Sequence, residues 1–382
     1  MPYFDNAATS WPKPDIVYKT MDQHFRQFGG SPGRSGHALA VAAEHQIEEV
    51  RNRLSKFFNA ESPERIVFTM NATDALNIAI KGMLGPGDHV ISSMLEHNSV
   101  TRPLAGMVEA GTIELDRISC GRDTRLNPDD LIPLIRPNTK LIALTHCSNV
   151  TGTLQPIQEF AKIARDHRIP LLVDGSQTAG IVPIDFQAMN IDLFAAPGHK
   201  SLLGPTGTGM LYVRPGLALK PFREGGTGSD SEQITQPLDM PFRLEGGTPN
   251  TLGIAGLGAA IKFLQGEDLE NRLAHERSLA IHFAEACAKL PNVEVHGSTE
   301  HTHRLGTVSI SIATMEPSDV SAILDQSFQI SVRSGLHCAP LAHQVLGTSP
   351  KGTVRFSFGI FNTDSEIDLA IQAIREIAAS LS

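Results

Sequence analysis

The chain has 382 residues, of which 41% are hydrophobic and 19% charged, so it can bury a large core and is long for a single domain. Its formal charge is −9 and it has no run of basic residues, which excludes the charge pattern of a protein that binds nucleic acid or an anionic membrane. No apolar run approaches the roughly 18 to 20 residues that span a bilayer, so we expect no membrane partner.

The cysteines point to a reducing compartment. They are widely spaced, form no CxxC motif and no cluster with metal-ligand spacing, and lie at Cys120, Cys147, Cys287 and Cys338. The N-terminal stretch lacks the basic and apolar regions of a signal peptide. These patterns predict a cytoplasmic protein with free thiols and no bound metal.

The first 14 residues predict an extended arm, because turn formers such as Asp5 and Asn6 precede two prolines. Ala7 in this arm is small enough to lie close to a ligand, or the arm simply tethers the terminus. After a glycine-rich loop, residues 38–58 have the apolar spacing of a helix.

The clearest supersecondary signal is a strand at residues 65–69 that leads through a short turn into a helix from Ala72. Thr73 is the expected N-cap of this helix, with Asp74 in its first turn. Free N–H groups at such a helix start suit a phosphate, although helices are also capped without any ligand.

Two further strands, predicted at residues 89–93 and 140–144, bring polar residues to the same sheet edge. The first leads to His97, whose ring could stack on a flat cofactor and exchange protons, or could belong to an ordinary surface histidine. The second leads to Asn149, before a helix that starts near Pro156.

Two short apolar runs, residues 169–173 and 191–196, predict buried strands that end in polar residues. Asp174 and Gln177 follow the first run, and His199 and Lys200 follow the second. A carboxylate and an amine at one sheet edge can face the same cavity. Pyridoxal 5'-phosphate requires this pair, the amine for a covalent link and the carboxylate to keep the pyridine nitrogen protonated, but a turn-forming Asp and a solvated Lys give the same pattern.

Residues 208–213 predict one more strand, which is antiparallel because its connection is short. From about Leu252 the organisation changes to a smaller α+β region. Its helices are expected at residues 273–289, 319–326 and 364–379, and its strands at 293–295, 307–312 and 330–332. The fold class is therefore α/β, with a mostly parallel sheet flanked by helices.

Separated blocks along nearly the whole chain, taken in order and spacing, resemble the cysteine desulfurase group of class V, fold-type I pyridoxal-phosphate enzymes. The blocks are residues 4–9, 71–74, 96–97, 148–149, 174–177, 198–200, 247–250, 333–340 and 355–357. The resemblance implies a homodimer with active sites at the subunit interface. It also implies a large domain at residues 15–255 and a small domain formed by residues 1–14 and 256–382.

The resemblance implies a role for each matched cofactor residue. Lys200 would form the Schiff base, Asp174 would hold the pyridine nitrogen, Gln177 would donate to the ring hydroxyl, and His97 would stack on the ring. The phosphate would be held by Ala72, Thr73 and His199, and by Thr248 of the other subunit. Pro197 departs from the family, which commonly has a phosphate-binding Ser there. The phosphate site is then either short of one donor or filled from elsewhere, for example by Ser201.

The substrate residues follow in the same way. Arg355 would grip the substrate carboxylate in a bidentate manner with help from Asn149. Arg333 and Ala7 also match positions near the substrate, Arg333 with a less defined role.

Cys338 decides the function within this fold. Its loop position beside His337 and near Arg333 is typical of a nucleophile rather than of an inert core cysteine, whereas Cys147 is expected to be structural. The separation of only 355 − 338 = 17 residues from Arg355 resembles the branch with a short, ordered cysteine loop.

The implied reaction converts L-cysteine to L-alanine, with Lys200 removing the Cα proton, His97 aiding protonation and the sulfur held as a persulfide on Cys338. A sulfur-acceptor protein would then receive the sulfur, for iron–sulfur cluster assembly or for modification of small molecules. Selenocysteine lyase, cysteine-sulfinate desulfinase and a class V aminotransferase remain alternatives on the same residues. A scaffold for sulfur-transfer partners with slow chemistry is a further alternative.

Overall fold

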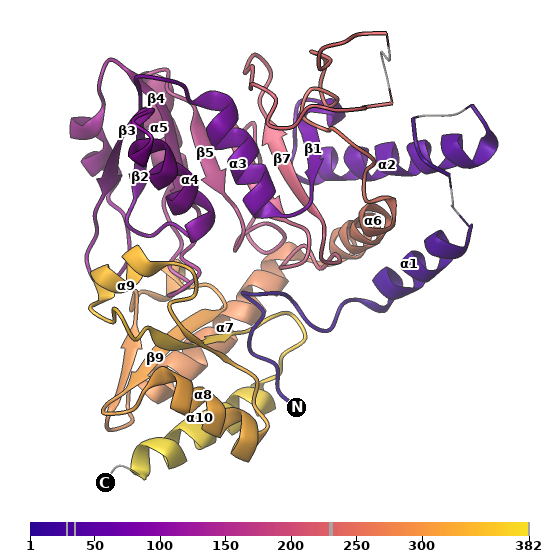
Figure 1. Ribbon diagram of the computed structural model, residues 1–382. Coiled ribbons are helices and arrows are strands. Elements are labelled where there is room, and N and C mark those ends of the chain that lie inside the picture. The colour runs from indigo at the N-terminus through magenta and orange to yellow at the C-terminus, as the bar shows by residue number, and fades with distance from the viewer. Residues whose placement is uncertain (28–29, 34–35, 229–231, 381–382) are drawn as a thin grey trace.

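The chain folds into two β-sheets of different size, each packed against helices (Figure 1). The computed structural model describes residues 1–27, 30–33, 36–228 and 232–380. Within these ranges the larger sheet has seven strands and the smaller sheet has four. No helix of the described ranges combines the length and the apolar character needed to cross a membrane.

The larger sheet has the strand order β1-β7-β6-β5-β4-β2-β3. Strands β2 to β6 run parallel, whereas β7 is antiparallel to both of its neighbours, as its short connection predicts. The strands are β1 (Ile66–Thr69), β2 (Asp88–Ser93), β3 (Ile113–Ile118), β4 (Thr139–Thr145), β5 (Leu171–Asp174), β6 (Leu193–Pro197) and β7 (Gly209–Val213).

Helices cover both faces of the larger sheet, which explains why its central strands are continuously apolar. On β5, Leu172 packs into a cluster with residues of α3 and α4, while its neighbours Leu171 and Val173 pack into the cluster that contains residues of α2, α5 and α6. The helices are α1 (Asp15–Gln27), α2 (Ala38–Phe57), α3 (Ala72–Met83), α4 (Asn98–Glu109), α5 (Ile157–Asp166) and α6 (Thr251–Gln265).

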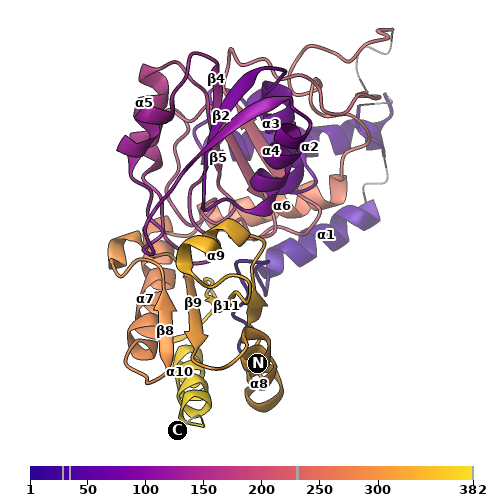
Figure 2. The ribbon, with the colours of Figure 1, turned by 60° about the vertical axis from the view of Figure 1, so that its left-hand side comes forward.

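The smaller sheet is antiparallel, with the order β10-β11-β9-β8. Its strands are β8 (Val293–His296), β9 (Thr307–Ile312), β10 (Arg333–Gly335) and β11 (Thr353–Ser357), and its helices are α7 (Leu269–Cys287), α8 (Pro317–Phe328), α9 (Pro340–Leu346) and α10 (Asp364–Ala379). In Figure 1 and Figure 2, α9 lies between this sheet and the larger one. The N-terminal arm pairs with Ser357 of β11 through Asp5, and with Ser331, just before β10, through Tyr3.

Several local predictions need correction. The strand expected at residues 330–332 begins later, at Arg333, because this segment pairs with β11 only from that residue on. The helix expected from residue 273 starts at Leu269, where Asp268 caps it. Asn71, and not Thr73, is the N-cap of α3, since its side chain accepts the N–H of Asp74. The domain boundaries at residues 14 and 255 stay a prediction.

Candidate active site

The carboxyl ends of neighbouring strands in the larger sheet gather the polar residues of the candidate site. Asp174 is the last residue of β5, and the adjacent strands β4 and β6 lead to Asn149 and Lys200. Strand β2, on the far side of β4, leads to His97. Because parallel strands end at one sheet edge, these side chains line a single cavity of about 210 Å³.

Most residues that the sequence predicted for the site line this cavity. They are Ala7, Ala72, Thr73, His97, Asn149, Asp174, Gln177, His199, Lys200, Arg333 and Arg355. Cys338 is adjacent, since its neighbour His337 is part of the lining. Thr248 is not brought to this cavity and instead lines a separate one of about 270 Å³.

Lys200 and Asp174 form the electrostatic pair at the centre of the site. Burial lowers the pKa of Lys200 to about 8, although Asp174 partly opposes this shift. Asp174 is 4% exposed, and its Oδ1 accepts the backbone N–H of Ser176 at 2.9 Å. A buried carboxylate therefore faces the same cavity as an amine that is partly neutral near physiological pH.

His97 enters the cavity as a neutral imidazole with a defined tautomer. It caps α4, and its Nδ1 accepts the backbone N–H of Ser99 at 3.0 Å. Burial lowers the pKa of His97 to about 4, against the opposing effect of Asp174. Since Nδ1 is an acceptor, the ring proton is on Nε2.

The start of α3 offers an anion site. The first N–H groups of a helix have no intrahelical acceptor, and Ala72 and Thr73 at this helix start both line the cavity. His199 lines it as well, and its buried Nδ1 has no hydrogen-bond partner among the described residues. Burial lowers the pKa of His199 to about 4, so this ring can act as a neutral donor.

Pro197 lines the cavity without a hydroxyl to donate. Ser201, one candidate to replace that donor, is wrong for this role because it lines a smaller neighbouring cavity and not the site cavity. One hydroxyl that lines the site cavity belongs to Ser99, whose Oγ is 2.7 Å from Thr73 Oγ1. Sequence reasoning missed Ser99, although its position directly after His97 and Asn98 was a usable signal.

Arg355 lines the cavity and is held by two partners. It is 1% exposed, and it pairs with Asp5 of the N-terminal arm at 2.7 Å and donates to the carbonyl oxygen of Asn149 at 3.0 Å. Its buried Nε has no partner among the described residues, and the residue lines the cavity. Burial lowers the pKa of Arg355, an effect that Asp5 opposes.

Gln177 is tied to the arm too, because its Nε2 donates to the carbonyl oxygen of Ala7 at 3.1 Å. The arm therefore forms one wall of the site. It contacts both Gln177, a candidate cofactor-binding residue, and the buried Arg355.

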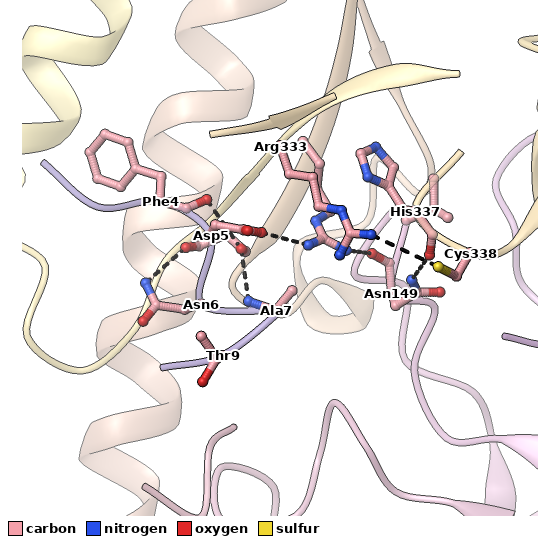
Figure 3. Close-up of polar contacts among 12 residues, drawn as sticks. Phe4, Asp5, Asn6, Ala7, Thr9, Asn149, Arg333, His337 and Cys338 are labelled. Carbon is pink, nitrogen blue, oxygen red and sulfur yellow. Dashed lines mark hydrogen bonds and ion pairs between the residues drawn. The ribbon is translucent and has the colours of Figure 1, made fainter. Parts of the chain in front are cut away.

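The Cys338 loop is held by hydrogen bonds to two of its carbonyl oxygens, and Figure 3 shows the loop beside Asn149 and Arg333. The carbonyl oxygen of His337 accepts from Asn149 Nδ2 at 2.7 Å, and that of Cys338 accepts from the backbone N–H of Asn98 at 2.7 Å. The backbone is left-handed at both residues, with φ of 48° and 58°, a conformation that non-glycine residues adopt only at a cost. This conformation places Cys338 Sγ 3.8 Å from a guanidinium nitrogen of Arg333.

Cys147, which does line the cavity, differs from Cys338. Cys147 is 2% exposed, and burial raises the pKa of its thiol. A protonated, buried thiol is a poor nucleophile, in keeping with the structural role expected for Cys147.

Thr248 lies on the glycine-rich loop that follows Glu245. The Glu245 carboxylate makes a bidentate pair with Arg51 of α2, at 2.8 and 3.0 Å, and accepts the backbone N–H of Phe68 at 2.6 Å. This loop is thus anchored to the larger sheet while Thr248 stays outside the site of its own chain.

The residues present fit pyridoxal 5'-phosphate on chemical grounds. The cavity combines an amine of lowered pKa, a buried carboxylate, a neutral histidine ring and a helix start beside an unpartnered His199 Nδ1. The amine suits the aldehyde of that cofactor and the carboxylate suits its pyridine nitrogen. The histidine ring suits the face of the cofactor ring, and the helix start with His199 suits the phosphate.

Comparisons with known proteins agree with this reading. Residues 2–369 match the Aminotransferase class-V family. A probable cysteine desulfurase of Halalkalibacterium halodurans is 34% identical over 98% of this chain and 92% of its own length. A solved cysteine desulfurase of Thermococcus onnurineus NA1, in its apo form, superposes with a TM-score of 0.93 at 32% identity, covering 99% of this chain and 95% of that one. The solved cysteine desulfurase CsdA of Escherichia coli has a TM-score of 0.88 at 30% identity, covering 99% and 94% of the two chains.

Proposed function

The chain belongs to the Aminotransferase class-V family, and within it we propose that it acts as a pyridoxal-phosphate-dependent cysteine desulfurase. In this reaction L-cysteine is converted to L-alanine and its sulfur is taken up by Cys338. One observation carries the proposal: a cysteine beside the Lys200 and Asp174 cavity is held in a left-handed loop with Sγ 3.8 Å from Arg333. An aminotransferase would not need this thiol.

The cofactor would be held by the residues of the cavity. Asp174 would pair with its pyridine nitrogen, His97 would lie against its ring, and the start of α3 with His199 would bind its phosphate. When bound, the cofactor supplies an aldehyde that captures amines and a ring that draws electrons from the substrate α-carbon. Gln177 can donate to the ring hydroxyl only if its bond to the Ala7 carbonyl oxygen is released or shared.

The substrate carboxylate would be bound by Arg355. Its guanidinium is already positioned by Asp5 and by the carbonyl oxygen of Asn149, so little side-chain entropy is lost on binding. Arg333 and Ala7 line the same cavity and complete the substrate side of the site.

Lys200 and Cys338 carry out the proton and sulfur transfers. With a pKa of about 8, the Lys200 nitrogen is neutral in a useful fraction of molecules and can accept the Cα proton of the substrate. The Cys338 thiolate, beside the Arg333 cation, then forms an S–S bond to the substrate sulfur as the C–S bond breaks. The bonding electrons stay on the substrate carbon, which takes up protons to give alanine, with His97 Nε2 as a nearby donor.

The assembly is part of the proposal. We infer a homodimer in which Thr248 reaches the phosphate site of the partner, because the anchored loop keeps Thr248 away from the site of its own chain. A sulfur-acceptor protein would take the sulfur from Cys338, for cluster assembly or small-molecule modification, in the cytoplasm.

Alanine release from L-cysteine tests this function. The Cys338→Ala variant should keep the bound cofactor spectrum and lose alanine production, because the sulfur has no acceptor. The matched control is Cys120→Ala, a half-exposed thiol that does not line the site cavity, and it should retain full activity. Equal alanine production by Cys338→Ala and wild type would contradict the role of Cys338, and a keto-acid product would indicate an aminotransferase.

A further inference from the structure

Ser99 joins two parts of the site to which separate roles are assigned. Its Oγ lies 2.7 Å from Thr73 Oγ1, at the helix start that would bind phosphate, and 2.9 Å from His97 Nδ1. Ser99 is 8% exposed and lines the cavity together with both partners. Among the described residues, Ser99 Oγ is the polar atom that contacts Thr73 Oγ1.

The direction of these hydrogen bonds follows from counting protons. A neutral imidazole with its proton on Nε2 has one in-plane lone pair, at Nδ1. The backbone N–H of Ser99, whose direction the helix fixes, already donates to that lone pair at 3.0 Å. The Ser99 hydroxyl lies 2.9 Å from Nδ1 and 2.7 Å from Thr73 Oγ1. Because the backbone N–H already occupies the Nδ1 lone pair, we assign the hydroxyl proton to the shorter contact, with Thr73 Oγ1.

The single proton of Thr73 is then directed elsewhere. An oxygen that accepts from Ser99 keeps its own proton for another acceptor, and Thr73 lines the cavity at the start of α3. In the reverse arrangement, Thr73 would donate to Ser99 and would have no proton for an anion.

We propose that Ser99 is a positioning residue whose hydroxyl donates to Thr73 Oγ1, so that Thr73 offers its only proton to a phosphate bound in the cavity. This inference rests on the proposed cofactor and extends it to a residue outside the matched blocks.

The test compares the full-length protein loaded with pyridoxal 5'-phosphate or with pyridoxal, which lacks the phosphate. The dissociation constant of pyridoxal divided by that of pyridoxal 5'-phosphate measures the preference for the phosphorylated ligand. This ratio reports the phosphate contacts alone. Ser99→Ala should reduce the preference for the phosphorylated ligand by about three- to tenfold, the effect of one hydrogen bond. Thr73→Val should reduce it by about tenfold or more, because a direct donor to a charged group is lost.

The double variant makes the test sharper. Since Ser99 acts through Thr73, adding Ser99→Ala to Thr73→Val should change the ratio no further. Ser99→Thr keeps a hydroxyl and should keep the ratio of the wild type. Ser92→Ala is the matched control, because Ser92 is also buried but donates to the carbonyl oxygen of Ala143 outside the cavity.

An unchanged or increased ratio in Ser99→Ala would overturn the proposal, because the reverse arrangement predicts a Thr73 proton set free for the phosphate. Full additivity with Thr73→Val, or loss of the ratio in Ser99→Thr, would overturn it as well. These results differ from failure of the proposed function, which would show as absence of cofactor binding by the wild type.

Discussion

Removal of the Asp5 side chain should destabilise the protein more than a change at a partly exposed residue of a terminal arm usually does. Asp5 lies on the N-terminal arm with its side chain 22% exposed, but its partner Arg355 has a side chain only 1% exposed. The two are 2.7 Å apart, and Asp5 is the carboxylate that pairs with Arg355 in the described part of the chain. Asp5→Ala therefore leaves a buried guanidinium without its counter-charge.

The size of the effect follows from this burial. Breaking a buried ion pair by removing one partner costs about 3–5 kcal/mol, and water reaching the partly exposed Asp5 position places the expected loss near the lower end. Asp5→Asn should cost less, because its amide oxygen still accepts from Arg355 while only the charge is lost.

Urea unfolding of the cofactor-loaded protein measures these differences. Asp22→Ala is the control, because Asp22 pairs with Arg26 on the surface of α1, where solvent screens the charges, and this change should not lower stability. The reasoning fails if Asp5→Ala is as stable as Asp22→Ala, or if Asp5→Asn is the less stable of the two Asp5 variants.

Two further predictions concern titration. Cofactor-free protein should take up pyridoxal 5'-phosphate at a rate that rises with pH and levels off above about pH 8. The reason is that burial lowers the pKa of Lys200 to about 8 and the neutral amine is the form that reacts. Stopped-flow absorbance measures this rate, and a rise that continues past pH 10 would contradict the prediction. Burial raises the pKa of Glu96 from its ordinary value of 4.5 to about 8. Between these pH values the folded state holds a proton that the unfolded state has lost, so this contribution to stability decreases as pH rises. Glu96→Gln keeps an acceptor for Ser93 and Thr145 and should give a stability curve that declines less between pH 4.5 and 8 in chemical unfolding; parallel curves would argue against a neutral Glu96.

Local pattern was sufficient for much of the fold. The apolar runs that predicted β5 and β6 end within two residues of the observed strands, and the last helix matches residues 364–379. Because successive βα units wind in one direction, the ends of β4, β5 and β6 had to bring Asn149, Asp174 and Lys200 to one edge. The expected N-cap at Thr73 was wrong because Asn71 competes for the same N–H groups, a choice that depends on backbone geometry at the turn.

The sequence by itself thus predicted the larger sheet except for β3, and it predicted that Asp174 and Lys200 follow neighbouring strands, because these features depend on short-range periodicity. Cys338 was predicted from its loop position and from the family resemblance. Only the tertiary structure decided which groups touch. The pairing of Asp5 with Arg355 joins residues 350 positions apart, and the contact between Ser99 and Thr73 joins two helix starts. Such contacts depend on how remote segments dock. The left-handed backbone at His337 and Cys338 is held by N–H donors from Asn149 and from Asn98 at the start of α4.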